Sequence, residues 1–472
     1  MMWNFKQYRQ NTALEDAKGS YMTYEELEQA GNEAAQAVSG RCLVFSLCKN
    51  SIGSIVGYTG FIQNKIVPLL LSAHLDTKLL QSLTEAYQPA YIWYPQETDI
   101  MAEGIKGDIV YEKYGYYLLK IAAESGTEDL YPELGLLLTT SGSTGSPKLV
   151  RQSYANIKAN AEQIADYLKI DSLERPVTTL PMNYTYGLSI INSHLMVGAS
   201  ICLTDSTIMQ KEFWNFLKEK RCTSFGGVPY TYEMLDKLRF YRMDLPYLKT
   251  ITQAGGKLGT ELHKKFAEYA LQNGKNFVVM YGQCEATARM GYLPPEYAAK
   301  KQGSMGIAIP EGRFILIDDA GNEILENDVS GELVYEGENV TLGYAEKRKD
   351  LAKGDEFQGK LYTGDLAKRD SDGFYYIVGR KKRFLKIYGN RVNLDEVEKL
   401  IKGSYDNLEC ACCGTDDHMD IFITEEAYAD EVKTFTAHKT GLNPAAFHVY
   451  VIESIPKNEA GKTLYGELKK YY

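Results

Sequence analysis

Apolar runs of strand length alternate with amphipathic segments through the first 300 residues. The runs 42–47 and 91–95 are predicted as buried strands, and the longer run 67–75 is predicted as buried structure because polar residues break it. Thr23 is followed three residues later by Glu26, which predicts a capped helix that reaches about Val38. This alternation of strands and helices predicts an α/β architecture.

The pattern changes at about residue 303. Four short runs, separated by Gly, Asp and Asn, predict a small β-rich subdomain: RFILID, GELVYEG, LYTGDLAKRD and GFYYIVGR. Residues 392–403 predict a helix with one apolar face, and a further β-α region follows to the end of the sequence. Residues 379–383 join a glycine to four cations where a strand ends, and we expect a boundary there.

Composition narrows the class of protein. The chain has 472 residues, of which 44% are hydrophobic and 24% charged, and this length is enough for about three folding units. These fractions exclude a wholly disordered, collagen-like or coiled-coil chain. The net charge of −10 argues against a broad surface for nucleic acid or anionic membranes, but it allows a local phosphate site.

No segment has the apolar length of a signal peptide or a membrane-spanning helix. We therefore expect a cytoplasmic protein without a transmembrane segment, whose eight cysteines are reduced. Cys410, Cys412, Cys413 and His418 could form a zinc site, but their spacing lacks a second pair of ligands. Two strands around an acidic turn are the favoured interpretation.

The segment LLLTTSGSTGSPKLV (136–150) carries the strongest chemical signal. An apolar strand leads into a loop of glycines and hydroxyl-bearing residues, and a helix is expected from about Tyr154. A Walker loop is excluded because Lys148 follows Pro147 rather than a glycine. A flexible surface loop is the alternative, but such a loop needs no apolar strand before it. The residues expected to hold phosphate oxygens are Thr140, Ser141, Gly142, Ser143, Thr144, Gly145 and Lys148.

Six further motifs follow this loop in a fixed order. They are LPMNYTYGLS (180–189) with the strand end Ala254-Gly255-Gly256, YGQCEAT (281–287), GELVYEGENVTLGY (331–344), YTGDL (362–366), GRKKRFLKIYGNRVNLDEVE (379–398) and PKNEAGKT (456–463). In this order the sequence resembles the acyl-adenylate-forming (ANL) superfamily of acyl- and aryl-CoA synthetases, luciferase and non-ribosomal peptide synthetase adenylation domains. The resemblance covers nearly the whole chain.

The resemblance implies a specific domain organisation. A large N-terminal AMP-binding domain with several subdomains would comprise residues 1–379, and a small mobile α+β lid domain would comprise residues 384–472. Residues 380–383 would form the hinge between them, with Lys382 as the residue about which the small domain rotates.

The resemblance also implies the nucleotide site. Glu285 would hold Mg²⁺ together with Thr144, Asp365 would bind the ribose hydroxyls, and Arg380 would contact ribose or phosphate. The other residues expected at ATP or AMP are Gly255, Gly256, Tyr281, Gly282 and Gln283. The sequence departs from the family at Cys284, where threonine is usual, and at Leu149, where glycine is usual; a thiol is the weaker hydrogen-bond donor.

Two lysines would divide the reaction between them. Lys462 matches the family lysine that bridges the acyl carboxylate and the α-phosphate during adenylation, where a cation lowers the repulsion of two anions. Lys386 matches the lysine that some members use in the second half-reaction. Solvated surface charge is the alternative for each.

The acyl group is expected not to be an α-amino acid. Amino-acid-activating members pair the substrate ammonium with an aspartate where this sequence has Thr185, and an unpaired ammonium would be costly to bury. Candidate pocket residues are Asn183, Tyr184, Thr185, Tyr186, Gly226 and Gly227. A hydrolytic site is not expected because the sequence has no G-x-S-x-G elbow, and His194 is interpreted as a hydrogen-bonded helix histidine.

The favoured function is that of an ATP- and Mg²⁺-dependent acid–thiol ligase. It would activate an acyl or aryl acid as acyl-AMP and pass it to CoA or to the phosphopantetheine of a carrier protein. One alternative is an adenylation enzyme that loads only an acyl carrier protein. The other is a nucleotide-binding protein whose chemistry is lost, a hypothesis that Cys284 favours.

Overall fold

The computed structural model describes residues 2–101, 104–122, 129–139, 148–381, 383–388, 390–405, 408–457 and 463–471. The chain forms two compact units. The first comprises residues 1–141, 145–313 and 335–361, and the second comprises residues 142–144, 314–334 and 362–472. The predicted domain boundary at residues 380–383 stays a prediction, and Lys382 lies outside the described residues.

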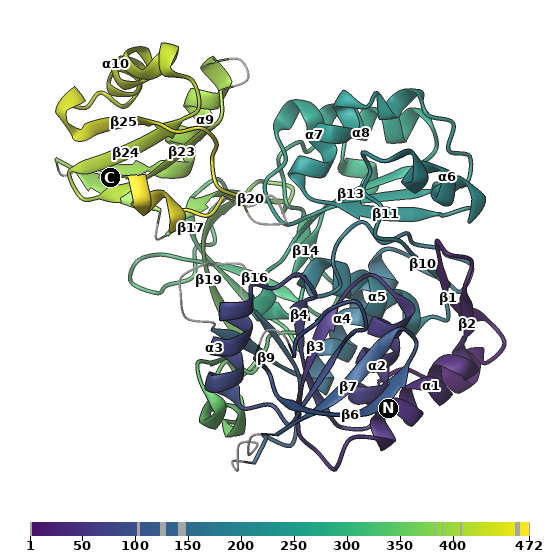
Figure 1. The fold of residues 1–472 in the computed structure, drawn as a ribbon. Helices are drawn as coiled ribbons and strands as arrows, with labels where there is room; N and C mark the ends of the chain where they lie inside the picture. Colours follow the sequence, from purple (N-terminus) through teal and green to yellow (C-terminus); the bar gives the residue numbers. More distant parts are fainter. Residues whose placement is uncertain are drawn as a thin grey trace. The chain divides into compact units, whose positions relative to one another are not determined.

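An eight-stranded sheet is the largest element of the first unit (Figure 1). Its strands, in spatial order, are β18 (Tyr344–Ala345), β9 (Leu149–Ser153), β8 (Leu134–Thr139), β4 (Val67–Ser72), β3 (Leu43–Cys48), β5 (Tyr91–Pro95), β7 (Tyr116–Ile121) and β6 (Gly107–Lys113). The central strands β8, β4, β3 and β5 run parallel to one another. They are buried almost throughout, as expected for parallel strands covered on both faces, so the predicted strands 42–47 and 91–95 and the buried run 67–75 are confirmed.

Two smaller sheets complete the first unit. One has the order β11 (Ser224–Gly227), β12 (Thr250–Gln253), β13 (Asn276–Tyr281), β14 (Gly291–Tyr292) and β15 (Ile307–Ala308), and its first three strands are parallel. The other has the order β10 (Ile201–Leu203), β1 (Thr12–Asp16) and β2 (Tyr21–Thr23). The helices of the unit are α1 (Tyr24–Gln36), α2 (Ile52–Gln63), α3 (Thr77–Tyr87), α4 (Tyr154–Tyr167), α5 (Thr185–Met196), α6 (Lys211–Glu219), α7 (Pro229–Lys237) and α8 (Thr260–Gln272).

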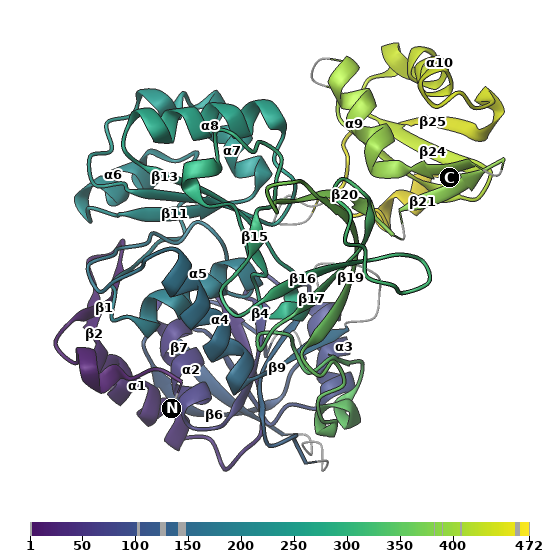
Figure 2. The ribbon, with the colours of Figure 1, turned by 180° about the vertical axis from the view of Figure 1, so that it is seen from behind.

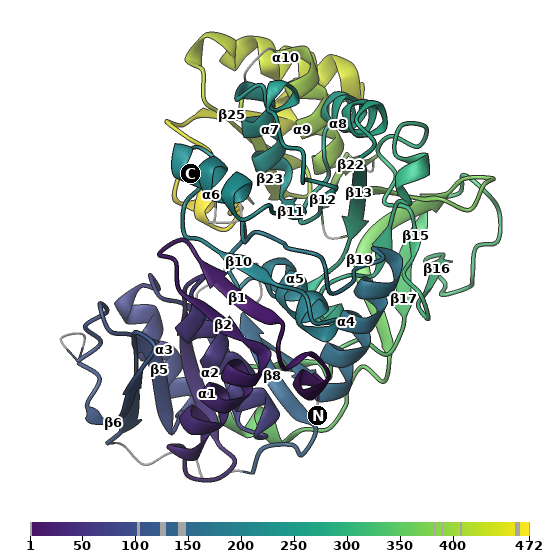
Figure 3. The ribbon, with the colours of Figure 1, turned by 90° about the vertical axis from the view of Figure 1, so that its right-hand side faces the viewer.

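The predicted helix start at Thr23 is confirmed. Thr23 Oγ1 accepts a hydrogen bond from the Glu26 amide at 3.2 Å, and Glu26 Oε2 accepts one from the Thr23 amide at 2.7 Å, which together form a capping box. The helix expected from Tyr154 is α4, which begins at that residue. Figure 3 shows α4 side by side with α5.

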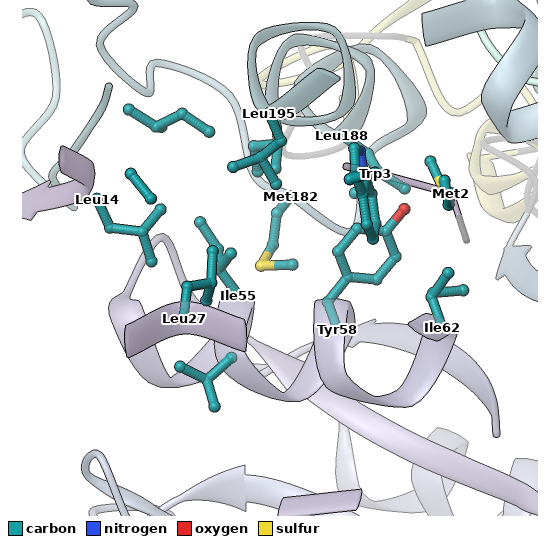
Figure 4. Close-up of a cluster of buried hydrophobic side chains, with 14 of the residues drawn as sticks. Met2, Trp3, Leu14, Leu27, Ile55, Tyr58, Ile62, Met182, Leu188 and Leu195 are labelled. Atoms are coloured by element: carbon teal, nitrogen blue, oxygen red, sulfur yellow. The ribbon is translucent and has the colours of Figure 1, made fainter. Parts of the chain in front are cut away.

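A large apolar cluster holds α2 and α5 together (Figure 4). Ile55, Tyr58 and Ile62 of α2 face Leu188 and Leu195 of α5. Trp3, which is fully buried, fills the space between the helices, and its ring meets that of Tyr58 edge-on at 5.7 Å between centroids. This packing fixes the start of α5, which carries two of the predicted acyl-pocket residues, Thr185 and Tyr186.

The second unit contains most residues of a four-stranded sheet. Its strands are β16 (Arg313–Ile317), β17 (Gly331–Glu336), β19 (Lys360–Arg369) and β20 (Tyr375–Arg380), of which β19 and β20 run antiparallel. All four coincide with the runs that predicted a β-rich subdomain, so that prediction is confirmed. The hairpin β21 (Phe384–Ile387) and β22 (Asn390–Asn393) follows.

The end of the chain forms a separate three-stranded layer. Strands β23 (Cys410–Thr415), β24 (His418–Ile423) and β25 (Phe447–Val451) carry helices α9 (Leu394–Ser404) and α10 (Ala429–Thr440) on one face (Figure 2). Cys410 and Cys412 point to these helices, whereas Ala411 points to the opposite face, as the two-residue period of a strand requires. The predicted helix 392–403 is therefore nearly right; it begins at Leu394 because Asn393 ends β22 and caps the helix.

The structure confirms two strands around an acidic turn for the cysteine-rich segment. No group of three or more possible metal ligands occurs among the described residues, and all eight cysteines carry thiols rather than disulfides. Within the same described ranges, no helix combines the length and the hydrophobicity needed to cross a membrane.

Candidate active site

Strands β8 and β9 flank the predicted phosphate loop. They pair antiparallel, with Thr139 opposite Leu149. The predicted residues Thr140, Ser141, Gly142, Ser143, Thr144 and Gly145 lie outside the described part of the chain. Lys148 is described, and its ammonium lies 3.5 Å from the centre of the Tyr344 ring, within the range of a cation–π interaction.

Glu285 reaches the same tyrosine from a different sheet. Strand β13 ends at Tyr281, and a short turn, Cys284–Ala286, then carries the carboxylate. The main-chain oxygen of Glu285 accepts hydrogen bonds from the amide and the hydroxyl of Thr341, both at 3.0 Å, which fixes the turn. The Tyr344 hydroxyl donates to Glu285 Oε1 at 2.8 Å. Lys148, Tyr344 and Glu285 therefore form one cluster, which we call the lysine–tyrosine–glutamate cluster.

The protonation state of Tyr344 suits a hydrogen-bond donor to Glu285. Burial raises the pKa of its hydroxyl above the ordinary value, and the nearby Glu285 carboxylate raises it further. The phenol therefore keeps its proton at neutral pH and acts as a donor. Glu285 uses one oxygen for this bond, and no described residue donates a hydrogen bond to its other oxygen.

Arg151 holds the strand that carries Tyr344. Its side chain is fully buried, and burial lowers its pKa although Glu356 partly offsets this effect. The guanidinium donates to the main-chain oxygens of Tyr344 at 3.0 Å, Leu342 at 2.8 Å and Gly354 at 3.1 Å. It also pairs with Glu356 at 2.6 Å. These bonds tie residues 342–356 to β9, directly after the phosphate loop.

Arg151→Met is expected to destabilise the first unit strongly. The change leaves buried carbonyls without donors, so the free energy of unfolding should fall by about 3 kcal/mol or more. Chemical denaturation followed by tryptophan fluorescence measures the loss. The matched control is Arg9→Met, since the Arg9–Glu25 pair is exposed and should contribute little. Equal stability of the two variants would contradict this role for Arg151.

Cys284 stands where the family usually has threonine. Its thiol lies 4.0 Å from the carbonyl oxygen of Thr139, at the end of β8, and it packs against the large apolar cluster. The thiol thus lies between the end of β8 and the turn that follows β13. The substitution weakens a donor without opening a cavity.

Two glycines allow tyrosines of the site to approach the backbone closely. Gly255 has φ +84°, and a Cβ there would lie 2.6 Å from the hydroxyl oxygen of Tyr184. A Cβ on Gly226 would lie 2.8 Å from the hydroxyl oxygen of Tyr186. Tyr186 Oη also makes a 2.8 Å hydrogen bond with Thr252 Oγ1. The predicted pocket residues Tyr184, Tyr186 and Gly226 thus lie together, alongside the predicted nucleotide residue Gly255.

The other predicted residues of the first unit are placed as follows. Thr185 donates from its hydroxyl to the Thr287 carbonyl, Asn183 is partly buried just before α5, and Gly227 packs on Thr231. Gln283 Nε2 donates to Tyr281 Oη at 3.3 Å. Gly256, which is exposed, has its carbonyl fixed by Gln253 at 2.9 Å, and Gly282 is packed against the Ala288 carbonyl.

Neither His194 nor the cavity beside α5 is part of a catalytic or acyl-binding site. His194 is buried and hydrogen-bonded to the Ile190 carbonyl at 2.7 Å, and burial lowers its pKa to about 4, which confirms the interpretation as a structural helix histidine. The cavity between α4 and α5 has a volume of about 10 Å³ and includes Thr185, Ser189 and Thr287 in its wall. It holds about one water molecule and is too small for an acyl chain.

The second unit brings Asp365 and Arg380 together. They face each other across β19 and β20, and Arg380 Nε lies 3.2 Å from Asp365 Oδ1. Asp365 is nearly buried, whereas 62% of the Arg380 side chain is exposed. The backbone of Lys386 pairs with Arg391 in the β21–β22 hairpin, but the Lys386 side chain and the whole of Lys462 lie outside the described residues. The loop of Lys462 begins and ends at the paired residues Lys457 and Thr463.

Comparison with known proteins identifies the family and the fold of the chain. The profile of the family described as AMP-binding enzyme matches residues 2–345. The chain is 28% identical over 363 residues to oxalate–CoA ligase of Arabidopsis thaliana, covering 72% of this chain and 68% of that protein. It is 29% identical over 377 residues to a long-chain-fatty-acid–CoA ligase of Salmonella typhimurium, covering 76% and 64%. The chain thus spans about two thirds of the length of these curated ligases.

Solved structures show the same fold. The o-succinylbenzoate CoA synthetase of Bacillus subtilis in complex with AMP superposes with a TM-score of 0.80 at 21% identity, covering 98% of this chain and 97% of that one. A benzoate CoA ligase from Burkholderia xenovorans gives a TM-score of 0.75 at 20% identity, with 98% of each chain covered. The chain therefore belongs to the AMP-binding enzyme family and has the α/β fold of these acyl-adenylate-forming CoA synthetases.

Proposed function

We propose that this protein is an ATP- and Mg²⁺-dependent acid–thiol ligase. It activates a carboxylic acid as an acyl-AMP, releases pyrophosphate, and transfers the acyl group to the thiol of CoA. The observation that carries the proposal is the lysine–tyrosine–glutamate cluster, in which Lys148 and Glu285 contact the same tyrosine from two different nucleotide motifs. The curated relatives named above are CoA ligases, which supports the same reaction class.

The donor set at Glu285 fits magnesium. Mg²⁺ prefers one or two carboxylates and keeps phosphate and water oxygens as its other ligands. Tyr344 occupies Oε1 of Glu285, so Oε2 is the oxygen that would bind the metal. When bound, the ion neutralises charge on the triphosphate and favours departure of pyrophosphate.

The protein's own residues then have separate tasks. Lys148 supplies a positive charge at the end of the phosphate loop, and Tyr281 offers a ring for the adenine. Asp365, on the second unit, accepts hydrogen bonds from the ribose hydroxyls, while Arg380 contacts ribose or phosphate. Lys462 lowers the repulsion between the acyl carboxylate and the α-phosphate, and Lys386 acts in thioester formation.

The acid is an acyl or aryl acid rather than an α-amino acid. Thr185 occupies the place where an ammonium would need a carboxylate, and its hydroxyl is already used by the Thr287 carbonyl. An α-ammonium at this position would be buried without a counter-charge, which is unfavourable by several kcal/mol.

CoA is the acceptor that the relatives support, and a carrier-protein phosphopantetheine presents the same thiol. We place the protein in the cytoplasm, where its eight thiols would stay reduced. The alternative of a protein that binds nucleotide without catalysing a reaction is disfavoured. Three predicted site residues that the structure describes, Lys148, Glu285 and Asp365, are placed where they could take part in catalysis.

Acid-dependent exchange of pyrophosphate into ATP tests the proposal. A panel of aliphatic, aromatic and dicarboxylic acids should contain at least one that supports exchange in the presence of Mg²⁺. Thioester formation with CoA and with a phosphopantetheinylated carrier then identifies the acceptor. Absence of exchange with every acid, in a protein that still binds ATP, would favour the nucleotide-binding alternative.

Tyr344→Phe is expected to weaken metal–nucleotide binding by roughly 10–100-fold, since it removes the group that orients Glu285. Phenylalanine keeps the ring beneath Lys148, so the change isolates the hydroxyl. Calorimetric titration of ATP at several Mg²⁺ concentrations measures the effect without catalysis. Tyr24→Phe is the matched control, because it removes a buried tyrosine hydroxyl whose 2.7 Å hydrogen bond goes to the Ala199 carbonyl rather than to Glu285. Unchanged Mg²⁺ dependence in Tyr344→Phe would show that the hydroxyl does not orient the carboxylate.

A further inference from the structure

Arg289 is a buried cation that the proposed mechanism does not use. Only 2% of its surface is exposed. Its Nε donates to Ser189 Oγ at 3.2 Å, and its Nη1 lies 3.0 Å from both Tyr167 Oη and Met280 Sδ. The guanidinium also lies 5.0 Å from the centre of the Tyr186 ring. All these partners are neutral.

No described carboxylate pairs with Arg289, and no described residue accepts a hydrogen bond from its Nη2. Arg41, which is partly buried, also has only neutral hydrogen-bond partners among the described residues. Three other arginines with little exposure each contact a carboxylate, namely Arg151, Arg175 and Arg383. Buried charges are normally paired, because hydroxyls and aromatic rings offset only part of the lost hydration. Arg289 therefore has capacity for an anion.

The position of Arg289 is fixed before any ligand arrives. Its carbonyl accepts hydrogen bonds from the side-chain amides of Asn160 and Asn339, both at 2.9 Å. Thr287, two residues earlier, has φ +62°, a conformation that non-glycine residues rarely adopt and that occurs often at functional sites. A guanidinium held in this way loses little freedom when it binds a planar anion.

Arg289 also lies among the predicted acyl-pocket residues. Its partners Tyr186 and Ser189 belong to the first turns of α5, and Glu285 precedes it by four residues. The Tyr186 hydroxyl abuts Gly226, and the Tyr184 hydroxyl abuts Gly255.

We propose that Arg289 binds a second carboxylate of the acid substrate, which is therefore a dicarboxylic acid. The inference rests on the proposed function, since it names the substrate class of the same site. One carboxylate is activated beside Glu285, and the other accepts a charge-assisted hydrogen bond from Nη2, the guanidinium nitrogen that no described residue uses. No bond is made or broken at Arg289.

Matched pairs of acids test the proposal in the wild-type enzyme. Succinate is compared with butyrate, and glutarate with pentanoate, because each pair has the same carbon count and differs in the second carboxylate. A charge-assisted hydrogen bond predicts at least ~10-fold higher kcat/KM for the dicarboxylate in pyrophosphate exchange. Equal or better use of the monocarboxylates, with exchange intact, would overturn the role of Arg289 and leave the proposed function standing.

The variant Arg289→Gln separates binding from folding. It should raise KM for the dicarboxylate by at least ~10-fold while leaving the calorimetric affinity for ATP unchanged, and Arg289→Lys should restore part of the loss. If the glutamine variant does not fold, the wild-type acid pairs decide the question. If no acid supports exchange, direct calorimetry of succinate or glutarate decides it: binding that Arg289→Gln abolishes supports the anion site, and absence of binding to wild type overturns it.

Discussion

Glu285→Ala is expected to lower ATP–pyrophosphate exchange by at least ~100-fold in a protein that folds normally. The variant loses the one described carboxylate of the lysine–tyrosine–glutamate cluster, so the metal lacks its protein ligand. The fold should persist because the main-chain oxygen of Glu285, which holds the turn through Thr341, is unaffected.

Glu285→Gln makes the same test more specific. An amide oxygen can still accept the hydrogen bond from Tyr344, so the local geometry is kept while the negative charge is removed. Binding of Mn²⁺, followed by electron paramagnetic resonance in the presence of ATP, should weaken in both variants. Glu268→Ala, an exposed glutamate on α8, is the control. Near-full exchange by either Glu285 variant at limiting Mg²⁺ would show that another group holds the metal.

The elements that sequence patterns predicted best are those determined by neighbouring residues. The capping box at Thr23 involves residues three apart, so its hydrogen bonds follow from the sequence alone. The four strands of the β-rich subdomain also have local causes, since each apolar run is bounded by turn residues. The shift of the predicted helix start from residue 392 to Leu394 has a tertiary cause, because the hairpin β21–β22 extends to Asn393.

The residues of the candidate site also differ in how far they could be predicted from local sequence. Glu285 could be identified because it stands in a recognisable motif. Tyr344 ends the motif GELVYEGENVTLGY, but its role depends on a contact with Glu285, which is 59 positions away. Arg151 reaches Tyr344 across 193 positions, and Arg289 reaches Ser189 across 100. No local pattern shows that an arginine is buried or that a tyrosine hydroxyl reaches a distant carboxylate, so Tyr344, Arg151 and Arg289 were not predicted as site residues.

The assignment of the two lysines remains a prediction from sequence. Lys462→Ala should lose acyl-AMP formation by ~10²–10³-fold but still convert supplied acyl-AMP and CoA to thioester. Lys386→Ala should retain exchange and lose thioester formation by a similar factor. The expected separation follows from the positions of the lysines, which lie 76 residues apart, one in a hairpin and the other in the loop that begins at Lys457 and ends at Thr463.

Measuring each half-reaction alone distinguishes a division of labour from general damage. Lys402→Ala, an exposed lysine on α9, should alter neither rate and serves as the matched control. A variant that merely unfolds the second unit would lose both half-reactions, whereas loss of one cation at a developing charge affects the step in which that charge forms. Reciprocal losses would therefore support two active arrangements of the second unit. Equal failure of both lysine variants in adenylation would instead favour a single fixed active site, and the hinge predicted at Lys382 would then have no catalytic purpose.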